Sequence, residues 1–151
     1  MTAQKLPIGI QSFEKIIKEK YIYVDKTRYI VQLLKGQVYF LSRPRRFGKS
    51  LFLSTLAAYF RGEKELFNGL YLAQAEEELA RQSKREAWQK HPVLYLDLNA
   101  KNFDTKQALI DTLERHLLNW EQEYNLVQRF DAPEDRFYDI IEQLYRSTGT
   151  R

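Results

Sequence analysis

The sequence predicts an α/β fold, with a parallel sheet flanked by helices, from three observations. Residues 38–41 and residues 93–98 are apolar runs without alternation, which is typical of strands covered on both faces. Apolar residues with a helical period lie between and after these runs, so strands and helices alternate along the chain. The first run is followed by a basic loop and then directly by a helical pattern. This order is typical of a turn that binds an anion at the start of a helix.

The composition predicts a folded protein in a reducing compartment. The chain has 151 residues, of which 44% are hydrophobic, enough for one domain with a sizeable core. It has no cysteine, which excludes disulfides, cysteine-based zinc sites and a cysteine nucleophile, so a cytoplasmic location is expected. No apolar run approaches the length of a membrane span, and we expect neither secretion nor membrane insertion.

The charge is unevenly distributed. The net charge is +4, but the window of residues 26–61 holds eight basic residues and no acidic residue. This basic window therefore carries +8 and the rest of the chain −4. The window predicts a concentrated positive field, which favours an anionic ligand.

The N-terminal part of the chain is expected to be a helical lead-in. Residues 1–11 show no periodicity and predict an extended segment, after which Ser12 caps a short helix. The aromatic and β-branched residues 21–24 predict a short strand or an extended segment. A second helix then ends at Gly36. Asp25 either caps the start of this helix or, with Lys26 and Thr27, contacts a nucleotide or closes over the basic loop.

The α/β core is expected to begin at residue 37 and to occupy residues 37–151, preceded by the lead-in of residues 1–36. Its predicted helices, in chain order, span residues 51–60, residues 75–90, residues 103–126 and a last stretch after Pro133. The run Glu76-Glu77-Glu78 predicts a solvated helix face. Residues 147–151 predict a loop that enters another strand.

Residues 43–50 match most of a phosphate-binding loop, whose usual pattern is G-x-x-x-x-G-K-[ST]. Gly48 lets the backbone approach a phosphate closely, Lys49 offers an ammonium to the terminal phosphates, and the Ser50 hydroxyl can ligate Mg²⁺. Arg43 stands where the first glycine belongs, and Pro44 stiffens the front of the loop and removes one N–H donor.

The sequence therefore predicts a nucleotide site that uses ATP and Mg²⁺. Arg45 and Arg46 are expected to compensate for the missing glycine through side-chain contacts to phosphate oxygens. The predicted binding residues are Arg45, Arg46, Phe47, Gly48, Lys49, Ser50 and Leu51, with Ser50 also as the metal ligand.

Two other functions remain open from the sequence. The basic window could contact nucleic-acid backbone, although most aromatic residues sit at helical core spacing, which makes base stacking a minor interpretation. The chain could also be a degenerate remnant that binds neither ligand. ATP and GTP are not distinguished.

These residues also resemble a known family, the bacterial AAA-ATPase-like proteins. The resemblance rests on Tyr23-Val24-Asp25-Lys26-Thr27, the stretch from Phe40 through Gly48-Lys49-Ser50 to Leu51, Ser54-Thr55-Leu56, Tyr59-Phe60-Arg61-Gly62 and Leu66-Phe67-Asn68-Gly69-Leu70. It implies a P-loop ATPase domain, in which an arginine at the first loop position is usual. Members of the family often continue into a PD-(D/E)XK nuclease-like domain, which is an expected partner here.

Hydrolysis needs an acidic site that the sequence does not clearly provide. Asp97 ends an apolar run but has no glutamate beside it, so a strand-end cap or turn is the favoured interpretation. The resemblance implies that the acidic strand arises after residue 151, so we expect only the N-terminal part of the domain, and whether the chain is an enzyme stays open. His91 and His116 are isolated, and His116 is interpreted as structural.

Overall fold

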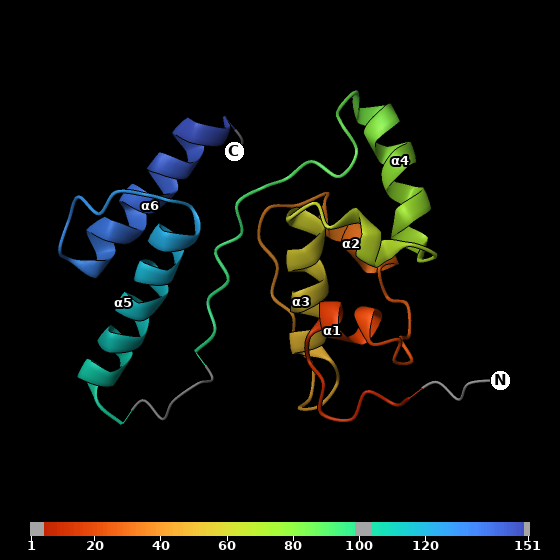
Figure 1. The fold of residues 1–151 in the computed structure, drawn as a ribbon, viewed down its shortest axis with the longest axis horizontal. Helices are drawn as coiled ribbons and strands as arrows, with labels where there is room; N and C mark the ends of the chain where they lie inside the picture. The colour runs from red at the N-terminus through yellow and green to blue at the C-terminus, as the bar shows by residue number, and fades with distance from the viewer. Residues whose placement is uncertain (1–4, 99–103, 150–151) are drawn as a thin grey trace. The chain divides into compact units, whose positions relative to one another are not determined.

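The computed structural model describes residues 5–98 and 104–149, and all regular elements within them are helices (Figure 1). The chain divides into two compact units, Met1–Val93 and Leu94–Arg151. None of the helices in the described ranges combines the length and the apolar character needed to cross a membrane.

The first unit begins with two short helices. Helix α1 spans Phe13–Lys18, and the Ser12 side chain accepts a hydrogen bond from the Lys15 N–H at 3.3 Å, as expected of an N-cap. Helix α2 spans Arg28–Leu33. The two helices predicted in the lead-in are therefore confirmed, but the N-cap of α2 is Thr27 and not Asp25.

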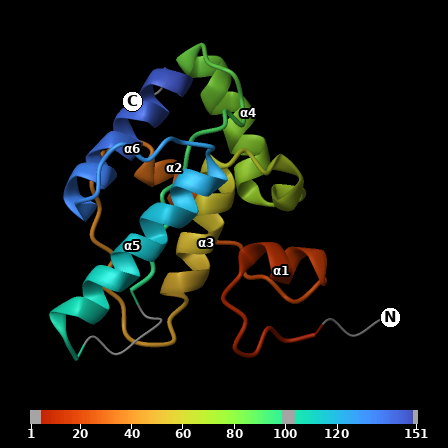
Figure 2. The same cartoon turned by 60° about the vertical axis from the view of Figure 1, so that its left-hand side comes forward.

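Three further helical elements complete the first unit. Helix α3 spans Lys49–Phe60, the 3₁₀ helix η1 spans Lys64–Phe67, and helix α4 spans Tyr71–Ser83. The bounds predicted for α4, residues 75–90, were wrong, because the helix begins before residue 75 and residues 84–90 are not helical. Figures 1 and 2 show α1 beside α3. The core of the unit is formed by Phe13, Ile30, Ala58, Tyr59, Leu66, Phe67, Leu72 and Trp88.

Asp25 ties the start of α2 to the start of α4. Its Oδ1 accepts hydrogen bonds from the Thr27 N–H at 2.8 Å and the Thr27 hydroxyl at 2.7 Å, while Oδ2 accepts from the Tyr71 N–H at 2.7 Å. Partial burial opposes ionisation of Asp25, but these three hydrogen bonds outweigh it and lower the pKa of the carboxyl group. Asp25 therefore joins two helix starts.

Glu76 is fully buried, so the prediction of a solvated face was wrong for this residue. Its carboxylate accepts hydrogen bonds from Arg85 Nη1 at 2.6 Å, Arg85 Nη2 at 2.9 Å, the Tyr59 hydroxyl at 2.8 Å and the Trp88 N–H at 3.0 Å. Burial, together with the neighbouring carboxylate, raises the pKa of Tyr59, which keeps its hydroxyl a donor. Glu77 and Glu78 are exposed, as predicted.

The second unit consists of helix α5, Lys106–Glu123, and helix α6, Pro133–Thr148, which pack against each other. Pro133 occupies the first turn of α6, where its missing N–H costs nothing. Glu121 and Arg136 form a buried two-pronged ion pair between the helices, with N–O distances of 2.6 and 3.0 Å. The apolar core consists of Leu117, Trp120, Ile140 and Leu144.

The predicted parallel sheet is wrong, because the described residues contain no strand or sheet. Residues 38–41 are extended but unpaired, with Val38 exposed to 92% and Phe40 to 93%. Residues 93–98 are likewise extended, and residues 21–24 contribute only an isolated bridge between Lys5 and Tyr21. An extended segment becomes a strand only when a neighbour completes its ladder of backbone hydrogen bonds, and no such ladder forms among the described residues.

The end of the chain also differs from the prediction. Helix α6 continues through Thr148, and Gly149 ends it in a left-handed conformation with φ of 65°. The predicted loop at residues 147–151 was therefore wrong at its first two positions, and residues 150–151 lie outside the described part.

Candidate functional site

The candidate site begins where the basic loop turns into α3. Gly48 is the N-cap and is left-handed, with φ of 74°, and no side chain caps the helix in the described structure. The first closing backbone bond runs from the Phe52 N–H to the Gly48 carbonyl at 2.9 Å. The preceding N–H groups of the first turn therefore have no intrahelical partner and form the positive end of the helix dipole.

Arg46 also has a positive φ, of 63°, which is uncommon for a residue with a side chain. Two left-handed residues two positions apart fold the loop sharply before the helix begins. A backbone held in this sparsely populated region costs roughly 1–3 kcal/mol. Lys20, Lys84, Trp88 and Asn125 share this conformation outside the loop, so it does not by itself indicate a ligand site.

A pocket of about 580 Å³ lies at this turn, within the volume range of small-molecule sites. One wall is made by Arg46 and residues 48–51, and the other by residues 7–11. Of the predicted site residues, this pocket brings together Arg46, Gly48, Lys49, Ser50 and Leu51. It is not lined by Arg45 or Phe47, which are exposed.

The wall formed by residues 7–11 was missed by sequence reasoning, which treated residues 1–11 as a lead-in. It is held in place through α1, because the Phe13 N–H donates to the Ser54 Oγ of α3 at 3.0 Å and the Phe13 ring is fully buried. Residues 7–11 carry no motif that could have indicated this wall.

Lys49 lies at the edge of the pocket with its ammonium held by the loop itself. Nζ donates a hydrogen bond to the Arg43 carbonyl oxygen at 2.8 Å. An ammonium has three donors, so this contact leaves two for an anion in the pocket. The residue at the unusual first position of the loop therefore positions the lysine through its backbone carbonyl.

Ser50 is half-buried and presents the only hydroxyl among the residues that line this pocket. A bound Mg²⁺ commonly takes one or two protein oxygens and completes its shell with phosphate and water. The Ser50 hydroxyl fits such a role. The described residues contain no group of three or more His, Cys, Asp or Glu side chains placed to hold a metal ion without a ligand.

The other residues singled out from the sequence lie elsewhere. The Asp97 carbonyl oxygen is 2.9 Å from His116 Nε2, and the His116 ring lies 5.7 Å from that of Trp120. The His91 N–H donates to the Phe60 carbonyl at 2.7 Å. These contacts join parts of the fold to one another.

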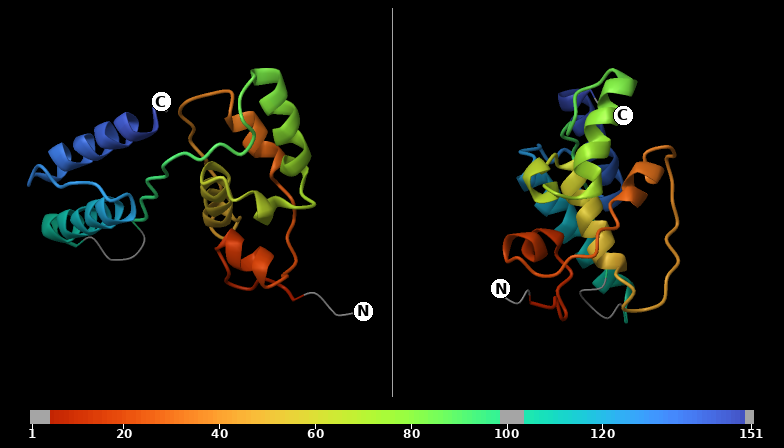
Figure 3. Two further views of the ribbon diagram at one scale, coloured as in Figure 1. Left: turned by 45° about the horizontal axis from the view of Figure 1, so that its top comes forward. Right: turned by 90° about the vertical axis from the view of Figure 1, so that its right-hand side faces the viewer.

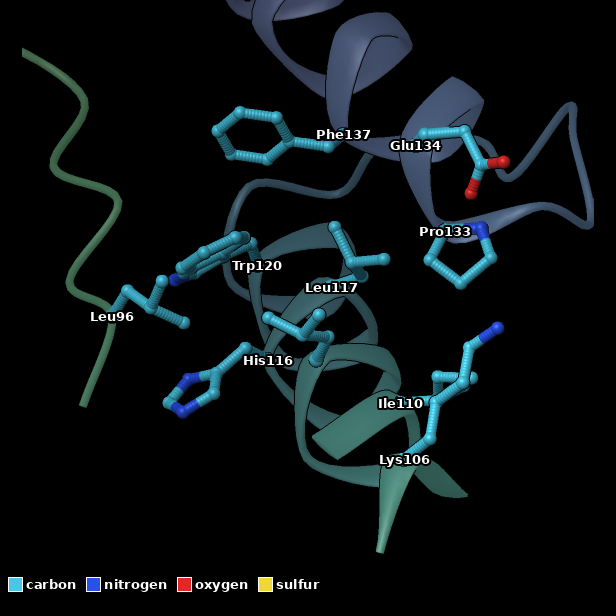
Figure 4. Close-up of a pocket in the computed structure, with 10 residues that line it drawn as sticks. Leu96, Lys106, Ile110, His116, Leu117, Trp120, Pro133, Glu134 and Phe137 are labelled. Atoms are coloured by element: carbon cyan, nitrogen blue, oxygen red, sulfur yellow. The ribbon is translucent and has the colours of Figure 1, made fainter. Parts of the chain in front are cut away.

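A second pocket, of about 570 Å³, lies within the unit formed by Leu94–Arg151. Figure 4 shows the apolar side chains of Leu117, Trp120 and Phe137 around it, with the polar groups of Lys106 and Glu134 at one end. This lining is mainly apolar and offers no set of cations for a polyphosphate. The pocket beside Lys49 is therefore the better candidate for an anionic ligand.

The comparisons with known proteins agree with the family resemblance found around the loop. A family model described as "Predicted AAA-ATPase" matches residues 7–151. The chain belongs to this AAA-ATPase-like family. The match begins at Pro7, so it includes the missed wall as well as the loop.

One curated relative is an "Uncharacterized protein in vnfD 5'region" from Azotobacter chroococcum mcd 1. It is 40% identical over 154 residues, which cover all of this chain and 28% of the relative. The chain thus spans little more than a quarter of the relative's length. No solved structure matches the chain.

Proposed function

We propose that the pocket at residues 46–51 binds the phosphates of a nucleotide, ATP in the first instance, together with Mg²⁺. The observation that carries this proposal is the convergence of Lys49, Ser50 and the uncapped start of α3 on one pocket. Backbone N–H groups, an ammonium and a hydroxyl are the donors and ligands that a magnesium-bound polyphosphate requires. Membership of the AAA-ATPase-like family supports a nucleotide-related role.

Each residue of the loop has a distinct task in this proposal. The amide groups at the start of α3 hold phosphate oxygens, and Gly48 permits the left-handed turn that aims them. Lys49 donates to the terminal phosphates while its third hydrogen bond stays on the Arg43 carbonyl. Bound Mg²⁺ would neutralise phosphate charge, with Ser50 as its protein ligand.

The two walls of the pocket contact different parts of the nucleotide in this proposal. The phosphates face Arg46 and residues 48–51, and the rest of the nucleotide extends toward residues 7–11, which contribute no charged side chain. Catalytic hydrolysis is not included in the proposal. The chain's contribution is binding within a larger ATPase-like protein.

Isothermal titration calorimetry of the full chain with ATP and Mg²⁺ tests the proposal. Lys49→Ala removes a charge-assisted contact of about 1.5–3 kcal/mol and is expected to weaken binding roughly 10- to 100-fold. Lys35→Ala is the matched control, because it removes the same charge from the basic window at an exposed position outside the pocket. Equal affinities for wild type and Lys49→Ala, or equal losses in both variants, would contradict the proposal.

A further inference from the structure

A second concave surface of the first unit lies between α2, α3 and the extended segment that joins them. This groove has a volume of about 430 Å³ and is lined by Tyr29, Gln32 and Leu33 of α2, residues 36, 37, 39, 40, 41 and 43, and Phe52, Leu53, Leu56 and Phe60 of α3. In the right-hand view of Figure 3, the segment leaves α2 and returns to the N-terminal end of α3 as one long extended stretch. Among the described residues, the groove and the phosphate pocket share no lining residue.

The groove presents aromatic faces to solvent. Phe40 is exposed to 93% and Tyr39 to 52%, although the sequence places both in a run predicted to be a buried strand. The Tyr39 hydroxyl donates to the Gln32 carbonyl at 3.3 Å, which anchors the hydroxyl end of its ring. Exposed aromatic rings are the platforms on which unpaired bases stack.

The groove is also positively charged. Arg43 lines it, and the Arg28 guanidinium lies 5.0 Å from the centroid of the Tyr29 ring and donates to the Tyr29 hydroxyl at 3.0 Å. The pKa of Tyr29 is lowered first by Arg28 and further by Arg43 and Lys26, so three cations act on one lining side chain. No acidic residue occurs in the basic window to offset them.

We propose that this groove binds a short stretch of single-stranded nucleic acid. Bases stack on Tyr39 and Phe40, and phosphates contact Arg28 and Arg43. The combination of exposed aromatic rings with neighbouring cations favours this partner over an acidic peptide, which needs the cations and not the rings, and over an anionic membrane, which a concave groove does not fit. The inference does not depend on nucleotide binding at the loop.

Fluorescence anisotropy of the full chain with a fluorescein-labelled 12-nucleotide oligo(dT) tests this inference. Phe40→Ala is expected to weaken binding roughly 5- to 100-fold, the usual effect of losing one stacked base. Because Phe40 is almost wholly exposed, the variant keeps the native core. Phe47→Ala is the matched control, since Phe47 is a 63% exposed aromatic residue outside the groove. This variant is expected to bind the oligonucleotide as tightly as wild type does.

Gly36→Ala tests the position of the Tyr39 ring without removing an aromatic residue or a charge. A Cβ at Gly36 would lie 2.4 Å from the Tyr39 hydroxyl oxygen and 2.8 Å from the ring carbon that carries it, so the ring must move. Gly36 is not left-handed, and the backbone accepts alanine without strain. A several-fold loss of oligonucleotide affinity is expected.

The salt dependence tests the phosphate contacts. Two neutralised phosphates on a single strand predict a slope of about −1.4 in a plot of log affinity against log salt, and Arg43→Gln should reduce its magnitude by about 0.7. Saturation with ATP and Mg²⁺ is expected to leave oligonucleotide binding unchanged.

Four results would overturn the inference. They are the absence of oligonucleotide binding, unchanged affinity in Phe40→Ala, full competition by anionic phospholipid vesicles, and displacement of the oligonucleotide by ATP and Mg²⁺. The last result would place the oligonucleotide on the phosphate pocket. Failure of nucleotide binding alone, with oligonucleotide binding intact, would count only against the proposed function.

Discussion

Replacing Glu76 with glutamine is expected to destabilise the first unit strongly, because one carboxylate holds three partners there. Arg85, Tyr59 and the Trp88 N–H all donate to it, and the Glu76 side chain is fully buried. Glutamine has nearly the same shape, so the change removes the charge and one acceptor without leaving a large cavity. The loss of stability therefore measures the contribution of the ion pair and its hydrogen bonds.

The magnitude follows from burial. Removing one partner of a buried ion pair costs about 3–5 kcal/mol because the other charge is left unpaired. The Arg85 side chain retains 29% exposure, so water can partly solvate it, and we expect the lower end, about 3 kcal/mol. For a unit of this size, each kcal/mol shifts the melting temperature by roughly 4–8 °C, so a drop of roughly 12–24 °C is expected.

Thermal unfolding followed by circular dichroism at neutral pH measures this effect. Glu77→Gln is the matched control, since Glu77 is exposed on the same helix and its ion pair with Lys64, at 2.9 Å, joins two exposed side chains. Such surface pairs contribute about 0–1 kcal/mol. Equal melting temperatures for the two variants would refute the argument that Glu76 holds the unit together.

The same residue gives a pH dependence of known sign. Burial opposes ionisation of Glu76, but Arg85, the Trp88 N–H and the Tyr59 hydroxyl outweigh it and lower the pKa. The unfolded chain, with a glutamate pKa of about 4.3, therefore takes up the proton before the folded chain does. The stabilisation is complete above about pH 4.3 and is lost as the pH falls through the lowered folded pKa, so the difference between wild type and Glu76→Gln should shrink there.

Two further substitutions test other contacts. Glu121→Gln leaves the buried Arg136 unpaired in the second unit and should cost about 3–5 kcal/mol in urea unfolding of the full chain; a cost below 1 kcal/mol would contradict a buried pair. Gly62→Ala places a Cβ 2.8 Å from the Trp88 carbonyl oxygen at a φ of +71°, whereas Gly69→Ala meets open space at +82°. Both incur left-handed strain of about 1 kcal/mol or more, and Gly62→Ala should melt at the lower temperature; equal values would contradict the clash.

The helices could be predicted from the sequence because their signals are local. The Ser12 cap and the proline at the start of α6 act within one turn of the residues they order. The apolar spacing within each helix is equally local. These features need no knowledge of where the rest of the chain lies.

The sheet could not be predicted reliably, because a strand depends on a partner that the pattern does not name. Residues 38–41 have the composition of a buried strand, yet Val38 and Phe40 are almost fully exposed. Composition gives the tendency to be extended, and only tertiary structure completes the hydrogen bonds. Glu76 shows the same limit. The run of three glutamates predicted a solvent-exposed position, but the ion pair with Arg85, nine residues later, makes its burial possible.

One part of the candidate site could likewise be predicted from the sequence, and the other part could not. Residues 48–51 follow from the Gly48-Lys49-Ser50 motif because strand-independent features, a left-handed glycine and a helix start, form the turn. The opposite wall at residues 7–11 carries no motif of its own and depends on the hydrogen bond between Phe13 and Ser54. A pocket shared by distant segments becomes visible only in three dimensions.

Nuclear magnetic resonance of the ¹⁵N-labelled chain, titrated with ATP and Mg²⁺, tests the central claim most directly. The account predicts that the amide signals of Gly48, Ser50 and Leu51 shift together along one saturating curve, accompanied by those of residues 9–11 on the opposite wall. The Glu77 amide on α4 should not move. Unchanged signals at residues 48–51 at saturating nucleotide would contradict the account.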